Sequence, residues 1–215
     1  MGVDPRPVAI LAIAGFIAAA LAMLTAPLLL GEGYDWVERS VSESAAQQTT
    51  DAWLGRLGLL LSGLAVLLVC IVRARVWGVV ATIAFALFGL FWMLTAVYST
   101  ESWIASVPRE PLENTLHSVF ATAMAVICVG ALVLVIRGGY ASTRWRIATA
   151  GLIAAASLLP LAAVVLPAFG GLLQRTMFVV AYAWFVREAC FAVGTRPEAS
   201  AHSSGRSTST KPSRS

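Results

Sequence analysis

Six stretches of about twenty nearly uncharged residues recur along this chain, and each is long enough to cross the roughly 30 Å hydrocarbon core of a membrane as a helix. They lie near residues 8–30, 54–72, 76–97, 116–136, 146–166 and 172–193. All are continuously apolar, whereas the strands of a membrane barrel alternate polar and apolar residues over about ten positions. The sequence therefore predicts an all-α, polytopic integral membrane protein with six transmembrane helices.

The composition agrees with this class. Hydrophobic residues make up 59% of the chain and charged residues only 12%, against about 25% charged residues in an ordinary soluble domain. The first stretch is a retained helix rather than a cleaved signal, because its apolar run is longer than a signal core and Pro27 follows the small residues where a cut would fall. Residues 1–194 form the predicted transmembrane domain. Residues 195–215 are rich in Ser, Thr and Arg and are expected to form a disordered cytoplasmic tail.

The basic residues predict the orientation. If the six stretches alternate, eleven of the fifteen Lys and Arg residues fall on the side of the two termini and four (Arg39, Arg56, Arg109 and Arg175) on the other. Basic loops stay in the cytoplasm, so both termini are expected there. Fourteen Arg against one Lys is typical of a GC-rich bacterial gene, and we expect a bacterial plasma membrane. The net charge of +4 is spread over short loops and a tail, which does not indicate nucleic-acid binding.

The sequence also predicts how the helices are connected and packed. The short segment Arg73-Ala74-Arg75 is the expected turn between the second and third helices. Small residues at helical spacing, Gly58 with Ser62 and Gly151 with Ala155, predict close helix contacts. Phe85, Phe88 and Trp92 share one helix face and are interpreted as packing or lipid-facing residues. Pro160 is expected to kink the fifth helix, and either a cavity at the kink or a simple bend would follow. Arg187 and Glu188 are expected to reach the cytoplasmic interface by snorkelling.

Ionisable residues gather where the fourth helix is expected to begin, inside the segment "PLENTLHS". Glu113 and His117 are four residues apart and therefore share a helix face, with Ser118 on the next stripe. His117 is the one histidine of the predicted membrane domain. Its titration near neutral pH suits proton transfer, headgroup binding or metal ligation. The structural alternative is an interfacial histidine that is hydrogen-bonded to Glu113.

Two further polar segments fall on the same side of the membrane. Gln174 and Arg175 lie about one turn inside the sixth helix, where a charge is costly and usually faces protein or water. Before the second helix, Ser42 and Glu43 occupy a serine-rich loop, and Arg56 enters the helix. Because Glu43, Arg56, His117 and Arg175 all fall on the outer side, we expect these four residues to surround one outward-facing pocket.

The same residues carry a family resemblance. The Ser-x-Ser/Glu element around Ser42 and Glu43, the Gly-rich second helix with Arg56, the His117-Ser118 pair and the Gln174-Arg175 pair resemble the domain of unknown function 998 family of small bacterial membrane proteins. The resemblance covers roughly residues 8–193. This family usually shows a Phe-Pro-x-Asp-like element after its third helix, where this chain has "YSTESWIASVP". The resemblance implies a six-helix fold and no established activity.

The leading hypothesis is that the pocket binds or handles a membrane lipid or anionic amphiphile. Arg56 and Arg175 would bind a phosphate in a fixed fork, and Glu113, Ser118, Gln174 and Ser42 would complete the site. A membrane-embedded hydrolase or transferase is the alternative, with His117 as base, Glu43 or Glu113 as its partner or acid, and Arg175 stabilising an oxyanion.

A third reading is an accessory subunit or homo-oligomer whose polar groups only hold the loops in place. We expect no cofactor and no metal, because a single histidine beside Glu113 and either Glu43 or Asp51 makes a poor zinc site.

Overall fold

The computed structural model describes residues 4–31, 33–139 and 142–194. Within them the secondary structure is entirely helical: α1 (Arg6–Leu29), α2 (Trp53–Trp77), α3 (Val79–Val97), α4 (Pro111–Arg137), α5 (Thr143–Val165) and α6 (Gly170–Gly194), with short 3-10 helices η1 (Glu43–Ala45) and η2 (Pro167–Phe169). All six long helices are sufficiently long and apolar to cross a membrane. The predicted all-α class with six transmembrane helices is confirmed. The predicted tail, residues 195–215, lies outside the described residues.

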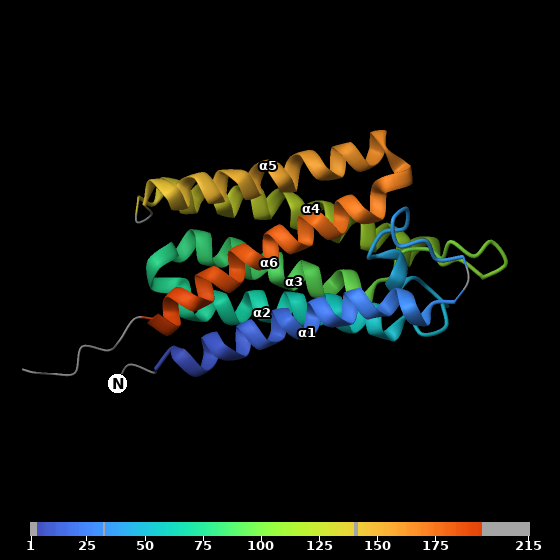
Figure 1. Ribbon diagram of the computed structural model, residues 1–215, viewed down its shortest axis with the longest axis horizontal. Coiled ribbons are helices and arrows are strands. Elements are labelled where there is room, and N and C mark those ends of the chain that lie inside the picture. The colour runs from blue at the N-terminus through green and yellow to red at the C-terminus, as the bar shows by residue number, and fades with distance from the viewer. Residues whose placement is uncertain (1–3, 32, 140–141, 195–215) are drawn as a thin grey trace, which may run out of the picture.

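The helices run back and forth between two ends of an elongated bundle (Figure 1). At one end, here called the loop end, lie the long connections 30–52 and 98–110 and the short one through η2. At the opposite end, here called the termini end, α1 begins, α6 finishes, and α2 joins α3 and α4 joins α5 by short turns (Figure 1). Length and irregular backbone are therefore concentrated at one end of the molecule.

The turn between α2 and α3 is not at Arg73-Ala74-Arg75, so that prediction is wrong. Both arginines continue α2, which ends at Trp77, and the chain reverses at Gly78 with a φ of 78°. Arginine is a good helix former, whereas a positive φ suits glycine, which lacks a Cβ atom. The displacement moves Arg73 onto a helix face, and its side chain points to another helix rather than into a loop.

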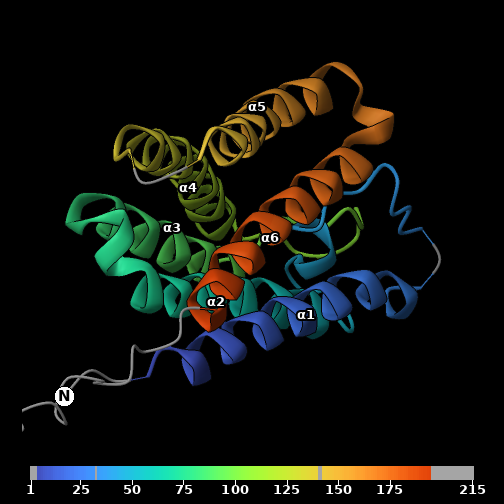
Figure 2. The same cartoon turned by 60° about the vertical axis from the view of Figure 1, so that its left-hand side comes forward.

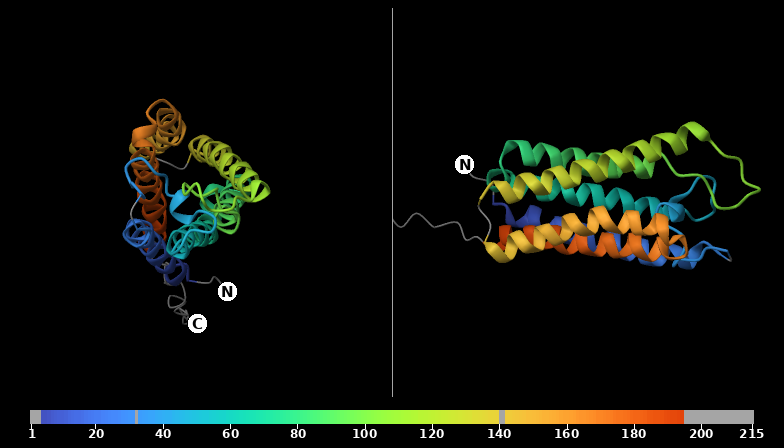
Figure 3. Two further views of the ribbon diagram at one scale, coloured as in Figure 1. Left: turned by 90° about the vertical axis from the view of Figure 1, so that its right-hand side faces the viewer. Right: turned by 90° about the horizontal axis from the view of Figure 1, so that it is seen from above.

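Helices α1, α2 and α3 pack closely through small residues. A Cβ atom at Gly58 would come within 3.3 Å of the Ala19 carbonyl of α1, and Cβ atoms at Gly63 and Gly89 would each collide with the other's carbonyl between α2 and α3. The expected contact at Gly58 is confirmed. Gly151 has nothing within 4 Å of its Cβ position, so the same expectation there is wrong. It fails because α5 lies at the edge of the bundle, beside α6 and α4 (Figures 2 and 3).

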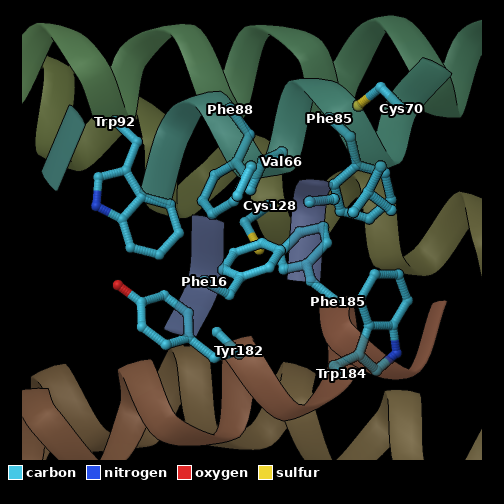
Figure 4. Packing of buried hydrophobic residues seen from close by; sticks show 14 of the residues in the cluster. Phe16, Val66, Cys70, Phe85, Phe88, Trp92, Cys128, Tyr182, Trp184 and Phe185 are labelled. Atoms are coloured by element: carbon cyan, nitrogen blue, oxygen red, sulfur yellow. The ribbon is translucent and has the colours of Figure 1, made fainter. Parts of the chain in front are cut away.

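An aromatic core joins α6 to the opposite side of the bundle (Figure 4). Phe85, Phe88 and Trp92 of α3 are buried, which confirms them as packing residues. Phe88 stacks on Phe185 of α6 at a centroid distance of 5.9 Å, and Trp92 stacks on Tyr182 at 5.9 Å. Long aromatic side chains thus bridge α3 and α6, and they set the distance at which α6 crosses the bundle diagonally (Figure 1).

Candidate functional site

The first turn of α6 is held by the α1–α2 connection. The backbone N–H groups of Gly171 and Leu172 donate to the carbonyls of Glu38 and Val37, at 2.9 and 3.0 Å. These are donors that a helix start leaves without partners, and the loop supplies them. A Cβ atom at Gly171 would collide with the carbonyls of Arg39 and Trp36, so this approach requires glycine. The loop therefore sits directly on the α6 N-terminus.

Arg175 fastens the same loop one turn further along α6. One terminal nitrogen donates to the carbonyls of Trp36 and Arg39 at 2.7 and 2.9 Å, and the other donates to the Tyr34 hydroxyl at 2.9 Å. Tyr34 in turn donates to the carbonyl of Ser40 at 2.7 Å. Burial raises the pKa of the Tyr34 phenol, and this outweighs the opposite influence of Arg175. The phenol thus stays a donor, and Arg175 binds oxygens of its own chain.

Gln174 anchors the same loop from a neighbouring face of α6. Its Oε1 accepts from the Val41 N–H at 2.6 Å. Next to it, Glu43 forms an ion pair with Arg39 at 3.0 Å and accepts from the Ser40 N–H at 2.6 Å. The structure thus brings Glu43 and Gln174 together, and both line a cavity described below.

Arg56 and Ser42 hold the short helix η1. Arg56 donates from Nε and a terminal nitrogen to the carbonyls of Ala45 and Ala46, both at 3.1 Å. Ser42 is the residue before η1, and its carbonyl accepts from the Ala45 N–H at 3.0 Å. Arg56 therefore binds the last carbonyls of a short helix, a favourable position for a cation.

His117 and Glu113 bind the end of α3. His117 is 6% exposed, and its Nδ1 lies 3.0 Å from the Thr95 carbonyl and 2.8 Å from that of Tyr98. Because carbonyls only accept, this nitrogen carries the hydrogen. Glu113 accepts from the Ser99 N–H at 2.7 Å. The two side chains share a face as predicted, but the interpretation of Glu113 as the hydrogen-bond partner of His117 is wrong. Backbone carbonyl and N–H groups at the C-terminal end of α3 bind both side chains instead.

Ser118 points away from these contacts. Its hydroxyl donates to the Asn114 carbonyl one turn back at 2.9 Å, and the residue is exposed on α4. The arrangement therefore aligns neither His117 with Ser118 nor His117 with Glu43 as a base and its partner. Among the described residues there is also no group of three His, Cys, Asp or Glu side chains that could hold a metal ion.

Gln47, which the sequence analysis did not single out, joins the two long loops. It is 2% exposed, and its amide nitrogen donates to the carbonyls of Ser99 and Glu110 at 3.0 and 3.1 Å. Its amide oxygen accepts from the Glu110 N–H at 2.9 Å. A glutamine in a polar loop gives no signal in a sequence, because only the tertiary structure places two other segments around it.

A cavity at the loop end lies between α5, the start of α6 and the loop, with a volume of about 350 Å³. This is at the small end of the range for ligand pockets. One wall is polar and is formed by Glu38, Ser40, Glu43 and Gln174. The apolar wall comes from α5, η2 and α6: Leu159, Pro160, Ala163, Pro167, Gly170 and Met177. On α6 it adjoins the polar wall, because Gly170 and Met177 share a helix face with Gln174.

The four residues expected around one pocket are distributed differently. Glu43 lines the cavity between α5, α6 and the loop, whereas Arg56 and His117 bind backbone carbonyls elsewhere at the loop end. Arg175 faces the α1 side of α6, where it lines a hollow of about 220 Å³ with Leu24, Pro27, Leu28 and Trp36. Adjacent residues on a helix point about 100° apart, so Gln174 and Arg175 bind different parts of the loop and line different hollows. The expectation that all four residues line one pocket is therefore wrong. Of the four, only Glu43 lines this cavity.

A second buried polar cluster lies in α2 and α6 toward the termini end, where snorkelling was expected. Glu188 is 0% exposed, and its Oε2 accepts from Arg73 Nε at 2.6 Å and from the Trp77 indole at 3.0 Å. Arg187 stacks over the Trp145 ring at 4.2 Å. The snorkelling interpretation of Glu188 is wrong, because Arg73 continues α2 and provides a buried partner that the expected turn would have removed.

These features define a polytopic α-helical membrane protein whose long loops are tied to the helices at one end. Within that class, the chain belongs to the family described as Protein of unknown function (DUF998), whose model matches residues 10–189. The predicted resemblance is thereby confirmed. Neither the curated proteins nor the solved structures compared with this chain gave a significant match.

Proposed function

We propose that this protein binds a lipid-like amphiphile in the cavity between α5, α6 and the 38–43 loop. The lining of the cavity supports this proposal, because it combines polar groups of the loop and Gln174 with apolar groups of α5, η2 and α6 at the end of a membrane-spanning bundle. An amphiphile has the same two halves. Its headgroup would lie against Glu38, Ser40 and Gln174, and its apolar part against α5. Ligand sites between bundle helices with a few convergent polar groups are a common arrangement.

The charged residues around the cavity argue against the anionic headgroup that the sequence favoured. An anionic headgroup was expected because Arg56 and Arg175 suit phosphate. Both guanidinium groups instead donate to carbonyls or to Tyr34, and the charged residues that line the cavity are Glu38 and Glu43. This favours a headgroup that can donate hydrogen bonds over one that only accepts them.

We further propose that the loop end faces the outside of a bacterial plasma membrane, with both chain termini in the cytoplasm. The distribution of charge supports this: Arg73, Arg75, Arg137, Arg144 and Arg146 belong to the termini end, and most acidic residues to the loop end. Reporter fusions after Gly139 and after Glu101 test the orientation. Activity of a periplasmic reporter at Glu101 and its absence at Gly139 is the expected result, and the reverse pattern would exclude an outer-leaflet ligand.

The binding proposal is tested by mass spectrometry of lipids that co-purify with the protein in native-lipid discs. The variant Leu159→Trp fills the apolar wall and should lose a lipid species that the wild type retains. Leu158→Trp is the matched control, because Leu158 is 61% exposed and does not line the cavity. Identical lipid profiles for wild type and Leu159→Trp would contradict the proposal and would favour a purely structural or accessory role.

A further inference from the structure

We infer that the headgroup bound in this cavity is neutral and polyhydroxylated, a sugar or another polyol. This inference rests on the proposed amphiphile site and adds the chemical class of its ligand. Its basis is the set of hydrogen-bonding groups on the polar wall that have no partner among the described residues.

Two free hydrogen-bond donors line the polar wall. The Gln174 amide oxygen is taken by the Val41 N–H, but its amide nitrogen has no hydrogen-bond partner among the described residues. The Ser40 hydroxyl oxygen accepts from the Glu43 N–H at 3.1 Å, which leaves the hydroxyl hydrogen free to donate. Gln174 is thus anchored through its amide oxygen and offers its amide N–H groups, whereas Ser40 accepts a hydrogen bond and still offers its O–H.

The acceptors on the same wall are carboxylates. Glu43 is engaged with Arg39 and with the Ser40 N–H, so it presents only its remaining lone pairs. The Glu38 side chain has no hydrogen bond or ion pair within the described part of the chain, although its carbonyl accepts from the Gly171 N–H. Glu38 is thus the one lining carboxylate that is fully available to a ligand.

A wall with both free donors and free acceptors discriminates between headgroup classes. A phosphate offers only acceptors and would meet two carboxylates, whereas an ammonium group offers only donors and would leave Ser40 and Gln174 unmatched. A hydroxyl group both donates and accepts, so several neighbouring hydroxyls match the whole wall. Charge-assisted hydrogen bonds from hydroxyls to the Glu38 carboxylate would be the strongest of these contacts.

The experiment compares three lipids with the same dioleoyl tails and different headgroups in phosphatidylcholine discs: a glucosyl diacylglycerol, phosphatidic acid and a primary-ammonium lipid. Lipids retained by the purified protein are counted by native mass spectrometry. We expect the glucosyl lipid to be enriched about tenfold over the other two, the effect of one charge-assisted hydrogen bond. Glu38→Ala should remove most of this preference. Glu101→Ala, an exposed carboxylate of the other long loop, is the matched control and should retain it.

The outcomes separate the two proposals. Equal retention of all three lipids that is lost in Leu159→Trp would overturn the headgroup class and leave the amphiphile site standing. Preference for phosphatidic acid or for the primary-ammonium lipid would also overturn the headgroup class. Retention of none of the three above the level of Leu159→Trp would contradict the polyol assignment. Binding of an amphiphile from native membranes would then be judged by the co-purification experiment alone.

Discussion

Charged residues that belong to the helices α2 and α6 are satisfied in different ways at the two ends of the bundle, although the loops of the loop end also contain the ion pairs Arg39–Glu43 and Arg109–Glu101. At the loop end, Arg56 and Arg175 donate to backbone carbonyls, and neither forms an ion pair within the described residues. At the termini end, Glu188 is completely buried and is neutralised by Arg73 of another helix. The difference follows from the connections. Long irregular loops leave carbonyls free to accept, whereas the tight turn at Gly78 leaves few.

This comparison teaches that a polar residue near the end of a transmembrane helix is not by itself a binding site. The arginines and His117 at the loop end are the residues that looked most functional in the sequence, and their contacts explain them as anchors of loops and helix ends. What remains available for a ligand is the less conspicuous set of Glu38, Ser40 and the Gln174 amide.

The largest expected effect is at the termini end. Arg73→Ala would leave the Glu188 carboxylate buried without its cation, and should lower the free energy of unfolding by ~3–5 kcal/mol. Unfolding in mixed micelles by increasing SDS, followed by tryptophan fluorescence, measures it. The double variant Arg73→Met with Glu188→Leu is the control and should recover most of the loss, because no charge stays buried. Wild-type stability of Arg73→Ala would show that Glu188 does not depend on this partner.

An intermediate effect is expected at the loop end. Arg175→Ala deprives the carbonyls of Trp36 and Arg39 of a shared donor, and should cost ~1–3 kcal/mol. Hydrogen exchange should accelerate in residues 34–41 and stay unchanged in residues 99–110, which Gln47 and Glu113 hold instead. Arg175→Lys retains the positive charge but lacks the planar guanidinium group, so its free energy of unfolding should lie between those of the wild type and Arg175→Ala. Uniform acceleration in both loops would mean that the loop end unfolds as one unit.

The smallest effect is expected for the exposed pair Arg109–Glu101, whose nearest charged atoms are 3.6 Å apart and whose side chains are about half exposed. Arg109→Ala should change the free energy of unfolding by less than about 0.5 kcal/mol, since solvent screens such pairs. The same SDS titration measures it. A loss as large as that of Arg175→Ala would show that stability at the loop end depends on charge pairing rather than on bonds to carbonyls.

Sequence patterns predicted the fold well because the membrane constrains it so strongly. Each helix needs about twenty apolar residues, and the start of α4 at Pro111 was visible from proline at a first helical turn. The end of α2 was misplaced because paired arginines were taken as a loop signal, although helix propensity carries them on to Trp77. The position of Glu188 could not follow from its neighbours, since its partner lies 115 residues away in the chain.

The sequence by itself determined the class, the family and the six membrane-spanning segments, because length, hydropathy and the motifs are local properties of the chain. Only the tertiary structure decided which polar residues meet. It placed Gln174 and Arg175 beside different hollows, put Glu43 rather than Arg56 or His117 in the cavity, and left Glu38 with a free carboxylate. Hydrogen-bond partners are chosen by the spatial arrangement of loops and helix ends, and hydropathy carries no information about that arrangement.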